Sequence, residues 1–111
     1  MDKLEKYRQI IESVVKKYAK YQPSHGHIQS LSICDRESDN YLLMDTGWDQ
    51  TGRVHAVAFH LQIVEGKVWI EWDGTERGIT QNLLDLGLAK EDIVLGFIRP
   101  EQRQFTDFYV A

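Results

Sequence analysis

The 111-residue sequence is poor in the features that tie a chain to a membrane or an oxidising compartment. Its single cysteine, Cys34, excludes an internal disulfide, and such cysteine usage fits the reducing cytoplasm. No apolar run approaches the roughly 20 residues that a membrane-spanning helix requires. Glycine and proline are too sparse for a linker. The sequence therefore predicts one soluble, cytoplasmic domain that spans residues 1–111.

The net charge of −4 is unevenly distributed. Residues 1–22 carry six Lys or Arg and three Asp or Glu, whereas the other 89 residues carry seven and fourteen. The overall negative charge argues against autonomous duplex-DNA binding, because phosphate neutralisation supplies most of the nonspecific affinity. The basic segment has two interpretations: a solvated helix face with cations near its C-terminal end, or an arm that contacts phosphates. The lysines concerned are Lys16, Lys17 and Lys20.

Apolar residues recur every three or four positions near the N-terminus, which predicts an amphipathic helix. Pro23 disfavours helical geometry at the preceding residue, so the helix should end near Gln22. The width of the apolar stripe indicates packing on a globular body. The stripe is formed by Leu4, Tyr7, Ile10, Ile11, Val14, Val15, Tyr18 and Tyr21.

From Ile28 to Asp73 the apolar period changes to two, which is typical of strands. Turn-forming sequences separate the apolar runs, so a four-stranded antiparallel meander is the simplest arrangement. The candidate strands are residues 28–36, 41–48, 53–64 and 67–73.

A second helix should follow the meander, since Ile79, Leu83 and Leu86 recur at helical spacing and Gly87 suits its C-terminal cap. Beyond it, the pattern predicts a short buried strand, a short helical segment that begins at a proline, and an extended end. These are residues 92–97, Pro100 and residues 105–111. The order of elements predicts an α+β domain.

The third and fourth strands should form a hairpin whose two-residue loop is Glu65-Gly66. This loop fixes a register in which one face is entirely apolar, and a one-residue slip would mix the two faces. The apolar face carries the pairs Ile63–Val68, Leu61–Ile70 and Phe59–Trp72. The opposite face carries the pairs Gln62–Trp69, His60–Glu71 and Ala58–Asp73.

The face opposite the core is the predicted recognition surface. Trp69 is its unusual member, because its side chain should point away from the face that carries Trp72. Either a helix of the same chain, with the tyrosine-rich first helix as a candidate, or another protein should cover it. An aromatic anchor in an interface contributes about 2 kcal/mol or more. The candidate partner-interface residues are Trp69, Glu71, His60 and Gln62.

The stretch GKVWIEWDGTERGI, residues 66–79, concentrates carboxylates and glycines without a recognisable catalytic pattern. Its glycines match neither the P-loop nor the dinucleotide template. Asp73 and Glu76 have the spacing of a helix capping box, and Thr75 is a competing cap. A small enzyme that uses Asp73, Glu76 and His60 is a third alternative. We expect no catalytic residue, metal or cofactor.

Several motifs together resemble the XisI family. Over roughly the last two thirds of the chain they are Gly-Lys-Val-Trp-Ile at 66–70, Asp-Gly-Thr-Glu at 73–76 and Asp-Ile-Val-Leu-Gly-Phe at 92–97. Members are described as controlling factors for excision of the fdxN DNA element in heterocyst-forming cyanobacteria. The resemblance implies a non-enzymatic accessory role in programmed DNA excision, while a separate recombinase cuts and rejoins the DNA. It also implies a partner, an XisH-like protein that resembles restriction-type nucleases.

Two functional hypotheses follow. The leading one is a binding module for the XisH-like partner. The alternative is a direct DNA-binding regulator that uses the basic first helix, with Lys16, Lys17 and Lys20 as its contacts. Self-association into a dimer or tetramer is a further expectation, because an antiparallel sheet leaves edges that must be covered or paired.

Overall fold

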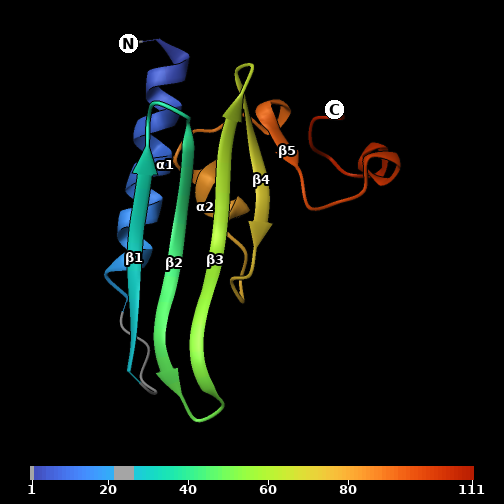
Figure 1. Ribbon diagram of the computed structural model, residues 1–111. Helices are drawn as coiled ribbons and strands as arrows, with labels where there is room; N and C mark the ends of the chain where they lie inside the picture. Colours follow the sequence, from blue (N-terminus) through green and yellow to red (C-terminus); the bar gives the residue numbers. More distant parts are fainter. Residues whose placement is uncertain (1, 22–26) are drawn as a thin grey trace.

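The computed structural model describes residues 2–21 and 27–111 and consists of one sheet with helices on one face (Figure 1). The α+β class is confirmed. In the described residues, every helix is too short or too polar to cross a membrane. The elements, in order, are α1 (Lys3–Ala19), β1 (His27–Asp35), β2 (Asn40–Asp49), β3 (Gly52–Val64), β4 (Lys67–Asp73), α2 (Thr80–Asp85), η1 (Lys90–Asp92), β5 (Ile93–Leu95) and η2 (Pro100–Phe105).

The sheet has the strand order β1-β2-β3-β4-β5. The first four strands pair antiparallel, which confirms the predicted meander. β5 joins the same sheet parallel to β4, with Ile93 aligned to Val68. Parallel neighbours need a crossover connection, which α2 and η1 supply here. The predicted short strand is therefore the fifth strand of a mixed sheet.

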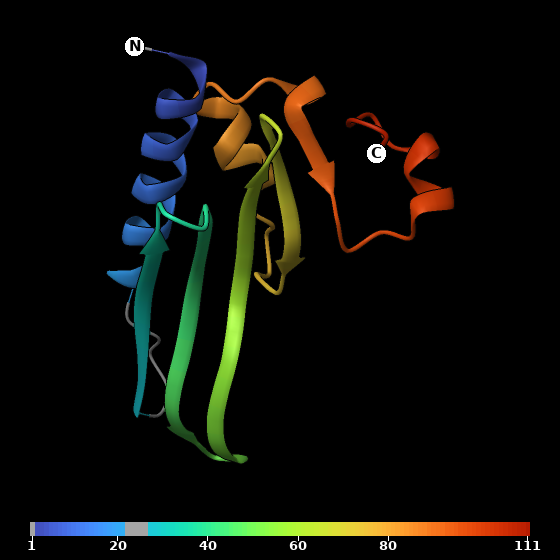
Figure 2. The same ribbon diagram turned by 45° about the horizontal axis from the view of Figure 1, so that its top comes forward.

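Both helices lie against the same face of the sheet and beside its upper part, while the lower parts of β1, β2 and β3 project beyond them (Figures 1 and 2). The rings of Tyr18 and Phe59 meet edge to face at 5.5 Å, which places α1 against the sheet's buried face. Asn82 of α2 donates a hydrogen bond of 2.8 Å to the Tyr18 hydroxyl. The core fills the space between this face and the two helices.

α1 begins where the sequence allows a cap, since Asp2 Oδ1 accepts a hydrogen bond of 2.8 Å from the Glu5 amide. Its buried residues are those of the predicted stripe: Tyr7, Ile10, Ile11, Val14 and Val15. The helix ends at Ala19, before the predicted end at Gln22, and Tyr21 is exposed. Gln22 and Pro23 lie outside the described residues.

The end of α2 matches the prediction and its beginning does not. Gly87 has φ +116°, and the Leu88 amide donates to the Leu83 carbonyl at 3.0 Å, which is the glycine-capped helix ending expected there. Leu86 is exposed and Leu88 is buried in its place. The helix begins only at Thr80, because Gly78 adopts φ +79°, which a right-handed helix cannot include.

Asp73 therefore holds a loop rather than capping a helix. Its Oδ1 accepts hydrogen bonds from the Thr75 amide at 3.0 Å and from the Thr75 hydroxyl at 2.6 Å. Its Oδ2 accepts one from the Ile79 amide at 2.9 Å. The predicted capping box of Asp73 and Glu76 is wrong, because the amides that Asp73 binds belong to non-helical backbone.

The predicted hairpin register is correct only near the loop. Glu65 and Gly66 have φ +50° and +77°, as a tight two-residue hairpin loop requires. The predicted pairs from Val64–Lys67 to Leu61–Ile70 are observed. Beyond them a β-bulge inserts one extra residue, Glu71, so that His60 pairs with Trp72 and Phe59 with Asp73.

This bulge overturns three predicted pairs. Phe59 is fully buried on the core face, whereas Trp72 is 54% exposed on the opposite face. The predicted pairs Phe59–Trp72, His60–Glu71 and Ala58–Asp73 are all wrong, because one inserted residue reverses the faces that follow it. A second bulge, between β2 and β3, leaves Ala58 without a partner and turns Val57 to the face of Met44.

A buried carboxylate connects the N-terminal helix to the sheet. Asp92 is only 2% exposed, and its Oδ2 accepts a 2.6 Å hydrogen bond from the Tyr7 hydroxyl and forms a 2.6 Å ion pair with Lys3. Its Oδ1 lies 3.0 Å from Lys67 Nζ. Burial opposes ionisation, but these hydrogen bonds outweigh it and lower the pKa of Asp92 to about 2.

Candidate functional site

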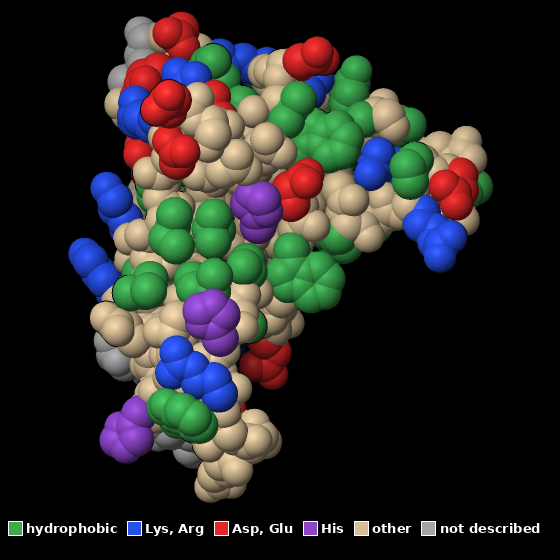
Figure 3. Space-filling view, in the orientation of Figure 1, with side chains coloured by type: hydrophobic (Ala, Val, Ile, Leu, Met, Phe, Trp, Pro, Cys, Tyr) green, Lys and Arg blue, Asp and Glu red, His purple; other side chains and the backbone are tan. Residues whose placement is uncertain are grey.

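The sheet face turned away from α1 and α2 is here called the outer face. The observed register gathers apolar side chains of four strands on it. We call this set the outer patch: Leu31, Ile33, Leu42, Met44, Val57 and Trp72. Figure 3 views this face and shows hydrophobic side chains grouped over the strands, with histidines beside them. No described helix covers these residues (Figure 1).

Trp72 is the most exposed member of the outer patch, at 54%. Leu31 and Ile33 follow at 37% and 41%, and the remaining three are partly buried. Soluble proteins seldom expose a contiguous apolar surface of this kind without a binding role. The sequence analysis did not select Trp72, since only the bulge at Glu71 turns it to this face.

Trp69, the predicted anchor, is covered by its own chain. The guanidinium carbon of Arg103 lies 5.1 Å from the centre of the Trp69 ring, a cation–π arrangement. α1 packs on the opposite face, so the prediction that the first helix covers Trp69 is wrong. The segment that follows β5 covers it in part, and Trp69 remains half-buried.

Arg103 is a buried cation that holds this C-terminal segment in place. Its side chain donates to three backbone carbonyls, those of Leu95 at 3.2 Å, Gly96 at 3.3 Å and Ala111 at 3.4 Å. Five N–H groups in a rigid plane suit arginine to such convergent carbonyls. No periodic pattern in the sequence signals this role, because the partners are backbone carbonyls on either side of η2 and the Trp69 ring of β4.

Glu71 also lies against the turn after β5. A Cβ atom at Gly96 would stand 2.8 Å from Glu71 Oε1 and 3.2 Å from Trp69 Cε3. A larger residue at position 96 would displace the flexible Glu71 carboxylate and crowd the Ile70 carbonyl oxygen, 3.1 Å away. Glu71 and Trp69 are adjacent to the C-terminal segment and form the upper border of the outer patch.

His60 and Gln62 lie on the outer face, next to β2 rather than to Glu71. The Nε2 atom of His60 lies 2.7 Å from Asn40 Oδ1. Asn40 donates its amide hydrogens to Ser38, so its oxygen is the acceptor and His60 donates. Gln62 is aligned with Asn40 on one side and Trp69 on the other. These polar side chains border the exposed ring of Trp72.

The structure does not assemble Asp73, Glu76 and His60 into a catalytic set. Both oxygens of Asp73 are occupied by backbone and hydroxyl donors of its own loop. Glu76 lines a cleft to which neither Asp73 nor His60 contributes. Across residues 2–21 and 27–111, no three His, Cys, Asp or Glu side chains gather in a way that could hold a metal ion.

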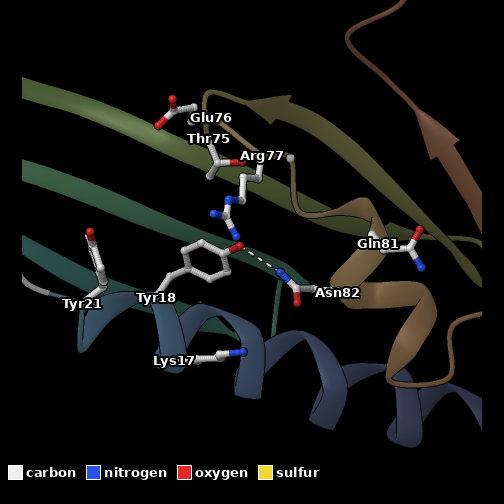
Figure 4. Close-up of a pocket in the computed structure, with 9 residues that line it drawn as sticks. Lys17, Tyr18, Tyr21, Thr75, Glu76, Arg77, Gln81 and Asn82 are labelled. Carbon is white, nitrogen blue, oxygen red and sulfur yellow. Dashed lines mark hydrogen bonds between the residues drawn. The ribbon is translucent and has the colours of Figure 1, made fainter.

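That cleft lies between the end of α1 and the loop before α2, and its volume is about 760 Å³ (Figure 4). Of the three predicted DNA-contacting lysines, Lys17 lines it, while Lys16 and Lys20 are exposed nearby on the chain. Arg77 extends into the cleft toward the ring of Tyr18 (Figure 4). In the described part of the chain neither Lys17 nor Arg77 forms an ion pair.

Comparisons with known proteins agree with this architecture. The family model described as XisI protein matches residues 1–110. A XisI-like protein from Anabaena variabilis ATCC 29413 has 34% identity and a TM-score of 0.89, with 98% of this chain and 100% of that chain covered. The fdxN element excision controlling factor XisI from the same organism has 38% identity and a TM-score of 0.80, with 99% and 100% covered. Among curated proteins, none matches. The chain belongs to the XisI family.

Proposed function

We propose that this protein is a non-enzymatic controlling factor for excision of a DNA element, and that it acts as a binding module for an XisH-like protein. The relative with 38% identity is named as an fdxN element excision controlling factor, which supports the general role. The observation that carries the binding module is the outer patch, with Trp72 54% exposed at its β4 end and no described helix over it.

The composition of the outer patch suits a protein partner. Its members are aliphatic, thioether or indole side chains, and such groups supply most of the binding energy in a protein interface. His60, Asn40 and Gln62 form a polar border, in which the 2.7 Å hydrogen bond between His60 and Asn40 orients both side chains before binding. An exposed indole ringed by polar groups is the arrangement expected of an interface hot spot. A flat sheet face of this kind offers contact area rather than a reaction pocket.

The test is a binding measurement between the purified chain and a purified XisH-like protein. Trp72→Ala should raise the dissociation constant by about tenfold or more, because it removes the largest and most exposed side chain of the patch. Phe105→Ala is the matched control, since Phe105 is a 76% exposed aromatic outside the patch. Equal losses for both variants, or none for Trp72→Ala, would contradict the proposal.

A second candidate function is direct DNA binding, and the cleft beside α1 favours it. Lys17 and Arg77 supply two cations without a described acidic partner, and Tyr18 and Tyr21 supply ring surface beside them. Phosphate groups bind such cations, and unpaired bases stack on aromatic rings. Glu76 in the same lining and the overall charge of −4 work against tight binding.

This candidate predicts salt-sensitive binding to DNA from the ends of an excised element. The double substitution Lys17→Gln, Arg77→Gln should weaken binding and reduce its salt dependence. With fewer phosphates neutralised by the protein, fewer counterions leave the DNA on binding. Lys90→Gln, in η1, removes one cation outside the cleft and should change little. Unchanged migration of the DNA at low salt and micromolar protein would rule this candidate out for the isolated chain.

A further inference from the structure

The open side of β1 is the longest unpaired strand edge in the described part of the molecule. β1 is the first strand in the sheet order and pairs only with β2. The opposite edge is much shorter, because β5 contains three residues. That edge is also partly closed, since the Tyr109 amide donates a 2.9 Å hydrogen bond to the Ile93 carbonyl. The two edges of this sheet are therefore not equivalent.

The β1 edge lacks the devices that normally prevent strands from pairing with other molecules. Residues 27–33, His-Ile-Gln-Ser-Leu-Ser-Ile, contain no Asp, Glu, Lys, Arg or Pro. β1 also has no bulge, since its register with β2 is continuous from His27 to Asp35. Monomeric proteins usually place lysine, proline or a bulge on an exposed edge, and a long uncharged edge pairs readily with another strand.

We propose that two copies of this chain pair antiparallel through their β1 edges, so that two five-stranded sheets become one continuous sheet. This inference concerns self-association of the chain and does not depend on the proposed function. The contact is isologous, because a two-fold axis brings the same strand of each copy together. Strand addition then gives the backbone donors and acceptors of the edge their partners.

Charge favours a second copy as the occupant. Each molecule carries a net charge of −4, so two copies repel unless the surfaces that meet are neutral. Residues 27–33 are such a surface. Like charges directly opposite each other destabilise paired strands. An antiparallel pairing of this stretch with itself contains no such pair.

Apolar continuity favours the same occupant. Leu31 and Ile33 lie on the outer face at the very edge of the sheet, 37% and 41% exposed. A second β1 strand would bring its own Leu31 close to Leu31 across the axis and cover part of this surface. Because Leu42 and Met44 adjoin them on β2, the outer patches of the two copies would merge across the axis.

The position of α1 leaves room for this pairing. Cys34 is half-buried against the core, and Arg36 forms ion pairs of 2.8 Å with Glu5 and 2.6 Å with Glu12. These contacts hold α1 beside the end of β1 and on the core face. The first part of β1 projects beyond α1 in both ribbon views (Figures 1 and 2). Pairing is therefore expected to centre on Gln29 to Leu31.

The experiment is sedimentation of the purified full chain over a range of concentrations, without other proteins. The expected result is a species of twice the chain mass of 12.9 kDa. The double substitution Leu31→Lys, Ile33→Lys should raise the dimer dissociation constant by about 100-fold or more, because like charges then face each other across the axis. The matched control, Phe105→Lys with Val110→Lys, adds the same charges at exposed apolar positions elsewhere and should leave the dimer intact.

Cysteine cross-linking gives a second readout that does not rely on charge. In a Cys34→Ser background, single cysteines at positions 29 and 31, which flank the proposed axis, should give an oxidised dimer. Val64→Cys, at an exposed position on β3 away from this edge, should give none.

Three outcomes would overturn the inference. These are a monomer at every concentration, a dimer that the Leu31 and Ile33 lysines leave unchanged, or cross-linking only at position 64. If the wild-type chain is monomeric alone and the β1 substitutions abolish binding of the XisH-like protein, the edge would be assigned to that partner instead. A stable dimer combined with no effect of Trp72→Ala on partner binding would contradict the proposed function and leave this inference standing.

Discussion

The side chain of Arg103 stacks over Trp69, with 5.1 Å between the guanidinium carbon and the ring centre. This contact joins the η2 segment to β4, two parts of the chain separated by α2 and β5. Arg103 is 7% exposed and binds only carbonyl oxygens and an aromatic ring. Arg103 therefore ties the C-terminal segment to β4 and β5, alongside the hydrogen bond from the Tyr109 amide to the Ile93 carbonyl.

Replacement of Arg103 by alanine should lower the free energy of unfolding by about 2 kcal/mol, because three carbonyls lose their shared donor. Urea denaturation followed by tryptophan fluorescence measures the change. Arg103→Lys is the informative control, since it keeps the charge but cannot reach three carbonyls at once and should recover only part of the loss. Full recovery by lysine would show that charge alone positions the segment.

The bulge at Glu71 predicts opposite consequences for two aromatic residues of the same hairpin. Phe59→Ala should cost about 3–5 kcal/mol of unfolding free energy, because Phe59 is fully buried and leaves a cavity. Trp72→Ala should cost about 1 kcal/mol or less, because its ring is already 54% exposed. Chemical denaturation of both variants compares them. Similar large losses would mean that both rings share the core, as an unbroken register requires.

This contrast also defines what the sequence could reveal. The pairs from Val64–Lys67 to Leu61–Ile70 follow from a two-residue loop and strict alternation, both of which are local. The bulge is not local. The alternation of Val68, Ile70 and Trp72 favours an unbroken register and gives no sign of an extra residue. Beyond the bulge the strands are joined by the 2.7 Å hydrogen bond from the Gly74 amide to the Ala58 carbonyl, a contact that no pattern within residues 67–73 reveals.

The start of α2 was mispredicted for a related reason. An Asp side chain that accepts from nearby amides can cap a helix or close a turn, and Asp73 does the latter. The glycine-capped end at Gly87 was predictable because its left-handed geometry requires that residue. The cover over Trp69 was not, since it comes from a segment distant in the sequence and lacks a periodic pattern of its own.

Acid should destabilise the protein in part through Asp92. Its folded pKa of about 2 lies below the ordinary value of 3.8, so its ionised form stabilises the fold above pH 4. This contribution, about 2 kcal/mol, is lost as the pH falls from about 4 to 2. Unfolding free energies of wild type and Asp92→Asn, measured across this range, should converge toward low pH.

Tyr7→Phe provides the intermediate case, because it removes one of the hydrogen bonds that favour the Asp92 carboxylate and retains both lysines. Between about pH 4 and pH 2, Tyr7→Phe should lose less unfolding free energy than wild type and more than Asp92→Asn. An Asp92→Asn variant with the full wild-type acid dependence would show that other carboxylates, not Asp92, carry it.

Two glycines near the end of the β2–β3 hairpin should tolerate alanine differently. Both have positive φ, +147° at Gly47 and +123° at Gly52, so alanine strains the backbone at each. Only at Gly47 would the added Cβ also overlap the chain, 1.9 Å from the His27 carbonyl oxygen. Gly47→Ala should cost about 3 kcal/mol or more and Gly52→Ala about 1–2 kcal/mol.

Thermal denaturation of the two variants distinguishes these effects. Equal losses would mean that φ alone determines the cost and that β1 can move away from Gly47. A larger loss at Gly47 would show that the β1–β2 pairing is rigid at this point.

α1 and α2 accompany only the upper part of the sheet, while β1, β2 and β3 continue past them (Figure 1). Backbone amides at the projecting end should consequently exchange with deuterated water sooner than amides in the part of the sheet that the helices cover. Local opening of the projecting end exposes less apolar area. A partner that binds this end would slow that exchange, and the protected peptides would identify its binding surface.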